Sequence, residues 1–351
     1  MVLVLIYAVF SLLIVRFCMV LFNFTSHPKL PGAPRNYYDF VSFLIPSYVD
    51  LTQLTGLVQS IREQEFENYE VLIYGNGAPE LRRLVKMASG NDSRFRIVQP
   101  LRPYGGGPPP EQTLAAQAGG DYFVFLNDLE RIEPGLVYSA IYRMKLHSLA
   151  LLSLFPEQKM KTFVEGQLVP LKNYLLVSLL PLRLVLLSPW KWLVAGNDQC
   201  LLFDAKHYRS FKWHSGTGSD TPRGPEIMKT MKALGFRVES LFANRYVSGR
   251  MYAGERSFLD FQADLISDFG GSAMALGAYL LFSYLGMIFL IPVLNMQLIG
   301  MALSLLVGMR VLSSLLNKQP VWWNVLFHPL QMTLLAAAIG ASLFRIVRKN
   351  P

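Results

Sequence analysis

The sequence predicts an α/β domain with a doubly wound, Rossmann-like mixed sheet, set between N-terminal and C-terminal transmembrane helices. Two observations lead to this fold class. Through residues 40–242, short apolar runs alternate with stretches of helical spacing, a pattern typical of βαβ units. The 351-residue chain is 52% hydrophobic with a mean hydropathy of +0.31, too apolar for an ordinary soluble protein. Its middle is too charged for a pure membrane bundle, so a globular domain with membrane segments at its ends fits both facts.

The balance of charge favours a membrane partner. The formal net charge is +9, which fits cytoplasmic loops in contact with anionic lipid. The sequence has no basic stripe with interleaved aromatic residues, so we expect no nucleic-acid partner. Its two cysteines, Cys18 and Cys200, make neither a zinc-ligand pattern nor a disulfide framework.

The N-terminal segment predicts a membrane anchor over residues 1–23. Val2–Phe22 is apolar except for Arg16 and has the length of one span. A signal peptide would need a charged start and a small-residue cleavage site, and neither is evident, which favours an uncleaved anchor. Lys29 and Arg35 follow the segment and no charge precedes it, so the positive-inside bias predicts a cytoplasmic domain.

The globular domain is predicted over residues 38–248 from the alternation of strands and helices. The predicted strands are Phe40–Ile45, Tyr69–Tyr74, Phe95–Val98, Tyr122–Leu126, Ala150–Phe155, Gln199–Phe203 and Val238–Phe242. The predicted helices are 51–64, 79–89, 112–118, 134–145 and 225–234.

Within the domain, residues 168–194 are very apolar but are broken by Pro181 and Pro189, so no uninterrupted run reaches spanning length. Cationic residues beside Leu, Tyr and Trp predict a segment in the membrane interface. The alternative is a buried helix pair. Residues 249–270 likewise predict an interfacial amphipathic segment.

Residues 272–345 predict C-terminal transmembrane helices. The predicted spans are Ser272–Leu294, Met296–Val311 (closed by Arg310 and Lys318) and Val321–Phe344. With a cytoplasmic domain, these three spans leave the basic C-terminus outside, against the positive-inside bias. The number of spans therefore stays open.

The strand Tyr122–Leu126 ends abruptly in Asn127, Asp128 and Glu130. In open α/β sheets, ligands bind just beyond the carboxyl ends of the strands. Acidic oxygens placed there can hold Mg²⁺ or Mn²⁺ against a phosphate, so Asp128, with Glu130 as partner, is a candidate metal site. The alternative is a strand end with a solvated acidic turn.

Two further groups of polar residues are ambiguous. Asn76, between two glycines, suits a hydrogen bond to a base or ribose but is also an ordinary turn residue. Arg250 suits a diphosphate because its guanidinium is planar, or anionic lipid at the interface. His207 and His214 are expected at the surface.

Several motifs, in this order, resemble the family 2 glycosyltransferases, which have a GT-A fold. The resemblance covers roughly residues 39–345, and its motifs are Val41–Pro46, Asn68–Ile73, Phe125–Gly135 and Ala233–Val238. More narrowly, Gly249–Tyr252 and Phe327–Leu330 with the trailing spans look like the membrane-bound members of carotenoid and hopanoid pathways.

The resemblance implies an inverting transfer of a sugar from a nucleotide-sugar to a lipid acceptor, at the inner (cytoplasmic) membrane. A divalent metal would neutralise the diphosphate leaving group, and a carboxylate would deprotonate the acceptor hydroxyl. By position, the resemblance implies nucleotide-sugar contacts from Pro46, Ser47, Asp50, Asn76 and Asp128. It implies a base at Glu226 or Asp220, and an acceptor or diphosphate side at Arg250 and Tyr252.

The chain departs from the family pattern at its site positions. The family has Asn-Glu at Val49-Asp50, paired Asp at Gly75-Asn76, D-x-D at Asn127-Asp128-Leu129, Lys near 108–110 and Glu-Asp near Arg223-Gly224. This many substitutions in a chain with an intact core pattern indicate altered or lost chemistry. The second hypothesis is therefore a catalytically inactive relative, retained as a membrane scaffold or as the partner of an active membrane protein.

Overall fold

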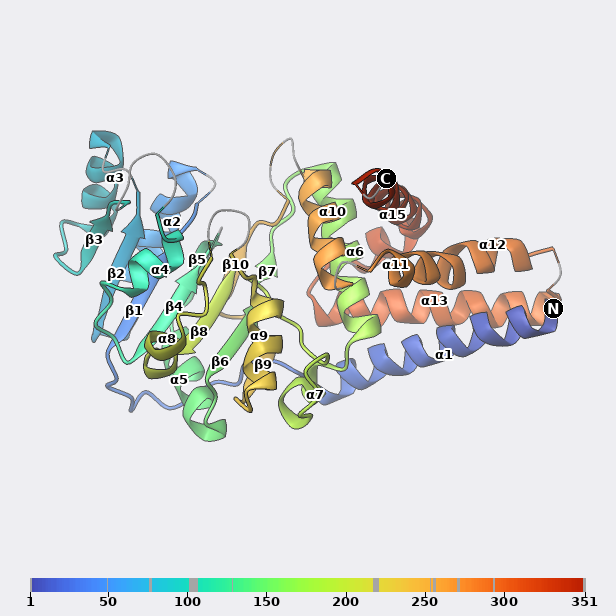
Figure 1. Ribbon diagram of the computed structural model, residues 1–351, viewed down its shortest axis with the longest axis horizontal. Coiled ribbons are helices and arrows are strands. Elements are labelled where there is room, and N and C mark those ends of the chain that lie inside the picture. Colours follow the sequence, from blue (N-terminus) through green and yellow to red (C-terminus); the bar gives the residue numbers. More distant parts are fainter. Residues whose placement is uncertain are drawn as a thin grey trace. The chain divides into compact units, whose positions relative to one another are not determined.

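The computed structural model describes residues 2–48, 50–75, 78–100, 107–127, 129–216, 221–252, 254, 257–269, 272–292 and 294–349, without the side chains of residues 2, 129, 130, 273, 287, 290 and 345–349. The chain divides into two compact units. We call Pro28–Lys159 with Leu182–Arg250 the sheet unit, and Met1–His27 with Met160–Pro181 and Met251–Pro351 the helical unit. Figure 1 labels the elements of both.

A seven-stranded mixed sheet organises the sheet unit, in the order β3-β2-β1-β4-β8-β6-β9. Its strands are β1 (Val41–Ile45), β2 (Tyr69–Tyr74), β3 (Phe95–Val98), β4 (Tyr122–Leu126), β6 (Leu151–Phe155), β8 (Cys200–Asp204) and β9 (Val238–Phe242). All pairs are parallel except those of β8, which runs antiparallel to both β4 and β6. The structure therefore confirms a mixed α/β fold.

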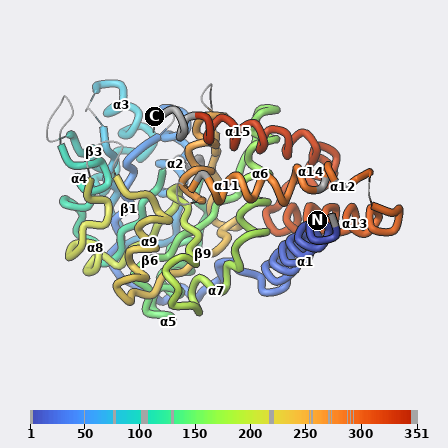
Figure 2. Tube along the Cα trace, turned by 45° about the vertical axis from the view of Figure 1, so that its right-hand side comes forward, coloured from blue at the N-terminus to red at the C-terminus, as the bar shows by residue number. Residues whose placement is uncertain are grey.

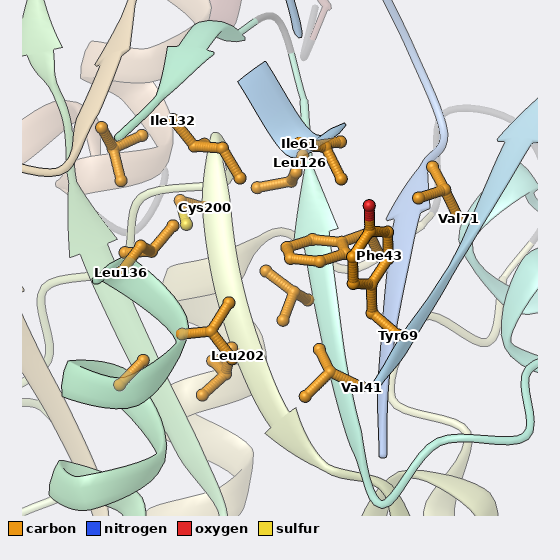
Figure 3. Close-up of a cluster of buried hydrophobic side chains, with 14 of the residues drawn as sticks. Val41, Phe43, Ile61, Tyr69, Val71, Leu126, Ile132, Leu136, Cys200 and Leu202 are labelled. Carbon is orange, nitrogen blue, oxygen red and sulfur yellow. The ribbon is translucent and has the colours of Figure 1, made fainter. Parts of the chain in front are cut away.

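Helices cover both faces of this sheet, because side chains of successive strand residues point to opposite faces. One face packs against α2 (Leu51–Arg62), α3 (Pro79–Ser89) and α5 (Leu136–His147). Figure 3 shows its core, in which Phe43 and Leu126 lie near Ile61, and Leu202 and Cys200 near Leu136. The other helices of the unit are α4 (Pro110–Ala115), α7 (Leu182–Leu187), α8 (Ala205–Phe211) and α9 (Gly224–Ala233).

A second, three-stranded sheet lies in the same unit, in the order β5-β10-β7. It consists of β5 (Leu129–Ile132), β7 (Glu157–Gln158) and β10 (Val247–Gly249). Leu129 of β5 pairs with Gly249 of β10. Strand β5 thus begins two residues after Asn127. These strands were not predicted, since two to four residues are too few to show a period.

The helical unit contains the remaining helices. They are α1 (Val2–Ser26), α6 (Phe163–Leu179), α10 (Ser257–Asp268), α11 (Ala273–Leu280), the π-helical turn η2 (Leu281–Leu285), α12 (Gly286–Leu290), α13 (Met296–Leu316), α14 (Val321–Leu326) and α15 (His328–Lys349). Figures 1 and 2 both show α1 lying along α13. Phe261 and Leu265 of α10 pack with Leu335 and Ile339 of α15 in this unit's core.

Two described helices, Leu3–Ser26 and Met296–Leu316, are long and apolar enough to cross a membrane. By length and composition alone they are weak evidence for spans. The second extends five residues past the predicted end at Val311, so that Arg310 lies inside α13 and is buried. The stretch 168–194 contains two helices, α6 in the helical unit and α7 in the sheet unit.

Candidate functional site

The carboxyl ends of β1 and β4 meet at one edge of the large sheet, since these strands are parallel and Leu44 pairs with Phe125. Buried Pro46 and exposed Ser47 follow β1, and Asn127 follows β4. The Ser47 hydroxyl donates to Asn127 Oδ1 at 3.3 Å. The structure thus brings together two positions at which a ligand of an α/β sheet would bind.

The Asn127 side chain is held by backbone. Its Nδ2 donates to the carbonyl of Asp198 at 2.9 Å, and its own backbone N–H donates to the carbonyl of Gln199 at 2.9 Å. A neutral amide stands at the first position of the expected acidic triplet, and both ends of that amide have protein partners. Asn127 therefore ties the end of β4 to the segment entering β8.

Asp198 joins that segment to the start of α9. Its Oδ1 accepts a hydrogen bond from the backbone N–H of Gly224, and its Oδ2 lies 3.3 Å from Arg223 Nε. A carboxylate at a helix N-terminus is favoured by the unpaired N–H groups and the helix dipole. Asp198 and Arg223 are about equally open to solvent, at 35% and 43% side-chain exposure, so this pair lies at an accessible edge.

The approach of α9 to this segment is close enough to require glycine. A Cβ placed on Gly196 would lie 2.4 Å from the Pro225 nitrogen, and one on Gly224 would lie 2.8 Å from Asp198 Oδ1. Both are shorter than real Cβ contacts. The backbone of residues 196–198 and the first turn of α9 thus form one packed feature, which we call the Asp198 clasp (Gly196, Asp198, Arg223 and Gly224).

Glu226, the predicted base, is exposed in the first turn of α9. Its Oε2 accepts a hydrogen bond from the backbone N–H of Arg223 at 3.2 Å. This is the helix-capping role of an acidic residue three positions past the cap. The other predicted base, Asp220, lies outside the described residues.

Glu111 is an acidic residue that the sequence analysis did not select. It lies in the first turn of α4, where it is half-buried. Burial raises the pKa of its carboxyl group, and the negative charge of Asp198 raises it further. A carboxyl group with a raised pKa next to a second carboxylate is a feature of acid–base sites. Its only sequence signal was a helix start after Pro108–Pro110.

Aromatic rings lie beneath this edge. Phe125 of β4 and Phe203 of β8 pack against Tyr208, and His214 lies over both phenylalanines, with centroids 4.9 Å and 5.6 Å away. The Tyr208 hydroxyl and His214 Nδ1 are 2.8 Å apart. Burial lowers the pKa of His214 to about 3, so the imidazole is neutral at physiological pH.

The predicted surface position of His214 is therefore wrong, because the ring is 5% exposed inside this aromatic group. His207 is half-buried, and its ring packs on Phe236 at 4.9 Å. No local pattern in the sequence indicates that the chain after α8 folds back on β4 and β8.

The remaining predicted site residues have varied places. Asp50 is the N-cap of α2, where its Oδ1 accepts from the backbone N–H of Gln53 at 2.7 Å. Arg250 follows β10 in the sheet unit, and Tyr252 belongs to the helical unit. There the buried Tyr252 hydroxyl donates to Asp264 Oδ2 at 2.8 Å.

The predicted metal ligands are only partly described. Asp128 and Asn76 lie outside the described residues, and Glu130 is described only as backbone in β5. The described residues contain no group of three or more His, Cys, Asp or Glu side chains arranged to hold a metal ion. Asn127 is neutral and both ends of its amide already have partners, so Asn127 is not a ligand for a divalent cation at this edge.

Comparison with known proteins identifies the fold. No family model matches the chain, and no curated protein matches it in sequence. Among solved structures, the mannosyltransferase PcManGT from Pyrobaculum calidifontis, in complex with GDP-Man and Mn²⁺, is 11% identical with a TM-score of 0.52, covering 97% of this chain and 99% of its own. TarS 1–349 from S. aureus with UDP-GlcNAc is 14% identical with a TM-score of 0.44, covering 87% and 89%. The chain therefore shares its fold with PcManGT.

Proposed function

We propose that the protein is a membrane-associated glycosyltransferase of the GT-A type, resembling family 2. It moves a sugar from a nucleotide-sugar donor to the hydroxyl of a lipid-type acceptor, with inversion. The observation that carries the proposal is the convergence of Ser47, Asn127, Asp198 and Arg223 at the carboxyl ends of β1 and β4. This is the edge at which nucleotides bind in α/β sheets, here in a chain with a glycosyltransferase fold.

The donor lies over this edge. PcManGT, of the same fold, is described with GDP-Man and Mn²⁺, which supports a nucleotide-sugar as the ligand. We assign donor contacts to Pro46, Ser47, Asp50, Asn76 and Asp128. Asp128, with Glu130, remains the proposed holder of Mg²⁺ or Mn²⁺, and Arg250 and Tyr252 the proposed acceptor side.

The acceptor reaches the protein from the bilayer. Two helices of the helical unit are apolar enough to cross a membrane, and an insoluble acceptor needs an enzyme held at its membrane. Lys29 and Arg35 after α1 favour the cytoplasmic side of the inner membrane for the sheet unit, with several spans in the helical unit.

A specific observation favours a second candidate, an inactive relative that serves as a scaffold or partner. The two described carboxylates nearest the family's base position, Asp198 and Glu226, both accept hydrogen bonds from the start of α9. A base must be free to take a proton from the acceptor. In this arrangement the catalytic base would have to be Asp220, or Glu111 with its raised pKa.

Nucleotide binding and sugar transfer separate the two candidates. The purified full-length protein is titrated calorimetrically with GDP, UDP, GDP-mannose and UDP-GlcNAc, each with Mn²⁺, with Mg²⁺ and with EDTA. Metal-dependent binding that Asp128→Ala abolishes and Asp92→Ala retains supports a donor site. Release of nucleotide diphosphate in the presence of membrane lipid then identifies the enzyme, whereas binding without turnover identifies the inactive relative. Failure to bind any nucleotide would contradict a donor site, whether active or inactive, in this protein.

A further inference from the structure

The helical unit buries two arginines in its interior. Arg16 of α1 is 1% exposed and Arg310 of α13 is 2% exposed. These are the two described helices that are long and apolar enough to span a membrane. A guanidinium stays charged at any accessible pH, so neither side chain can become neutral to escape the cost of burial.

The two arginines lie close together around one ring. The guanidinium carbons of Arg16 and Arg310 lie 5.0 Å and 3.8 Å from the centroid of the Tyr174 ring on α6. Arg16 also lies 5.3 Å from the centroid of Tyr279. The separation of the two like charges thus cannot exceed the sum of their distances to Tyr174. Arg16, Tyr174 and Arg310 lie on α1, α6 and α13, three helices that contact one another.

The hydrogen-bond partners of these guanidinium groups among the described residues are neutral. Arg16 Nη2 donates to the Ser178 hydroxyl at 3.1 Å, and Arg310 Nε donates to His328 Nδ1 at 2.7 Å. Since an arginine can only donate, His328 Nδ1 must carry a lone pair. Among the described residues, Arg16 Nε, Arg310 Nη2 and the Tyr279 hydroxyl are buried and have no hydrogen-bond partner.

Of the described acidic side chains of the unit, Asp260 is exposed and the other three have partners elsewhere. The sequence contains no Asp or Glu before Asp39 and none after Asp268. Asp264 and Asp268 form ion pairs with Lys172, and Glu165 accepts from the backbone N–H of Lys161 at 2.8 Å. In the described part of the helical unit, neither Arg16 nor Arg310 has a carboxylate within ion-pair distance.

We propose that Arg16, Arg310 and the Tyr279 hydroxyl form a binding site for a phosphate group, that of an anionic membrane lipid. Guanidinium forks match phosphate oxygens, and the phosphate supplies the negative charge that is missing next to the two arginines. Cation–π contacts with Tyr174 hold the forks while leaving N–H groups to donate. This site lies in the helical unit alone and does not rest on the proposed transfer reaction.

The depth of the site suits a headgroup. Arg310 lies six residues before the end of α13 at Leu316, which is about 9 Å along the helix axis. The next helix, α14, exposes Trp322 at 87%, and tryptophan is typical of the membrane–water interface. A lipid phosphate therefore reaches Arg310 from the interface, and free inorganic phosphate is the other source of the same chemistry.

The test measures ligand-induced stabilisation of the full-length protein in a neutral detergent, with native mass spectrometry to count bound lipid. The probes are phosphatidylglycerol, diacylglycerol, which lacks the phosphate, and inorganic phosphate. We expect phosphatidylglycerol to raise the wild-type melting temperature by about 5 °C and diacylglycerol to leave it unchanged. Equal stabilisation by both lipids overturns the proposal. An effect of inorganic phosphate as large as that of the lipid keeps the phosphate site but overturns the lipid source.

Variants locate the effect. Arg16→Met with Arg310→Met should abolish the phosphatidylglycerol response, whereas Lys318→Gln, which removes an exposed charge after α13, should keep it. A response that survives the double substitution contradicts the site. Should the double variant fail to fold, Tyr279→Phe removes only a hydroxyl, and we expect it to weaken lipid binding about tenfold. Its matched control is Tyr284→Phe, because the Tyr284 hydroxyl contacts Thr333 at 3.0 Å instead. Equal lipid binding by Tyr279→Phe and Tyr284→Phe removes Tyr279 from the site.

Discussion

The sheet unit and the helical unit differ in how they bury arginine. In the sheet unit, Arg143 donates to both carboxylate oxygens of Glu239 at 2.6 Å and 2.5 Å, and the two side chains are 11% and 2% exposed. His214 in the same unit is kept neutral by burial. In the helical unit, Arg16 and Arg310 are more deeply buried than Arg143, and their hydrogen-bond partners among the described residues are neutral.

The difference lies in which groups neutralise the buried charges of each unit. In its interior the sheet unit pairs Arg143 with Glu239, and at its carboxyl edge Asp198 and Arg223 form a partly exposed pair. Among the described residues of the helical unit, no carboxylate pairs with Arg16 or Arg310, and the proposed phosphate would supply that charge. Removing single charges or rings from each unit tests this difference.

The largest effect is expected from Glu239→Gln in the sheet unit. The substitution keeps the volume but leaves Arg143 without its carboxylate, with Arg183 3.9 Å from the same group. Breaking a buried pair from one side should lower the free energy of unfolding by about 4 kcal/mol. Denaturant titration followed by tryptophan fluorescence measures it. Glu157→Gln, which affects the more exposed pair with Lys159, is the control and should cost under about 1 kcal/mol. Equal losses would show that the Arg143–Glu239 pair is not special.

The second-largest loss of stability is expected from Tyr174→Leu in the helical unit. The leucine loses the ring that both guanidinium groups approach, which should cost about 3 kcal/mol in detergent. Tyr174→Phe keeps the ring and loses only a hydroxyl that donates to Met309 Sδ at 3.9 Å, so it should cost under about 1 kcal/mol. Thermal unfolding of both variants decides between a role for the ring and a role for the hydroxyl; similar losses would refute the cation–π argument.

A pH titration tests how the sheet unit keeps its histidine neutral. The pKa of His214 falls from an ordinary value near 6.5 to about 3 on folding. Stability is therefore complete above pH 6.5 and is lost as the pH falls from there toward pH 3. Between pH 7.5 and pH 5 we expect a loss of about 2 kcal/mol from this residue. His214→Phe should remove that part of the pH dependence. A variant with the wild-type pH profile would mean that His214 does not cause it.

Much of the fold follows from the sequence because it rests on hydrophobic runs. All seven strands of the large sheet were predicted within one residue at either end, from Val41–Ile45 to Val238–Phe242. The reversal of β8 was not visible, because a fully buried strand is apolar throughout whichever way it runs. The short strands β5, β7 and β10 depend on pairing that no local pattern records.

The site was less accessible to sequence reasoning. Asp198 lies before a strand instead of after one, so the rule that ligands bind at carboxyl ends passed over it. Its neighbours Arg223 and Gly224 are distant in sequence, and only the fold unites them. Arg16 was visible as the one charge in an apolar segment, but its nearness to Arg310 needed the packing of α1, α6 and α13.

The smallest expected effect concerns the partly exposed Asp198–Arg223 pair at the carboxyl edge of the sheet. Asp198→Asn keeps an acceptor for the Gly224 N–H but removes the charge opposite Arg223, in a pair that is over one-third exposed. We expect a loss of about 1 kcal/mol in denaturant titration.

The consequence for function is more informative than the stability. Removing the charge of Asp198 lets the pKa of Glu111 move down toward its ordinary value and frees Arg223 to meet a phosphate. Nucleotide affinity of Asp198→Asn should therefore equal or exceed that of the wild type, with Asp92→Asn, which weakens only the Asp92–Arg94 pair, as the control. A tenfold loss of nucleotide affinity in Asp198→Asn alone would show instead that the charge of Asp198 is needed for nucleotide binding at this edge.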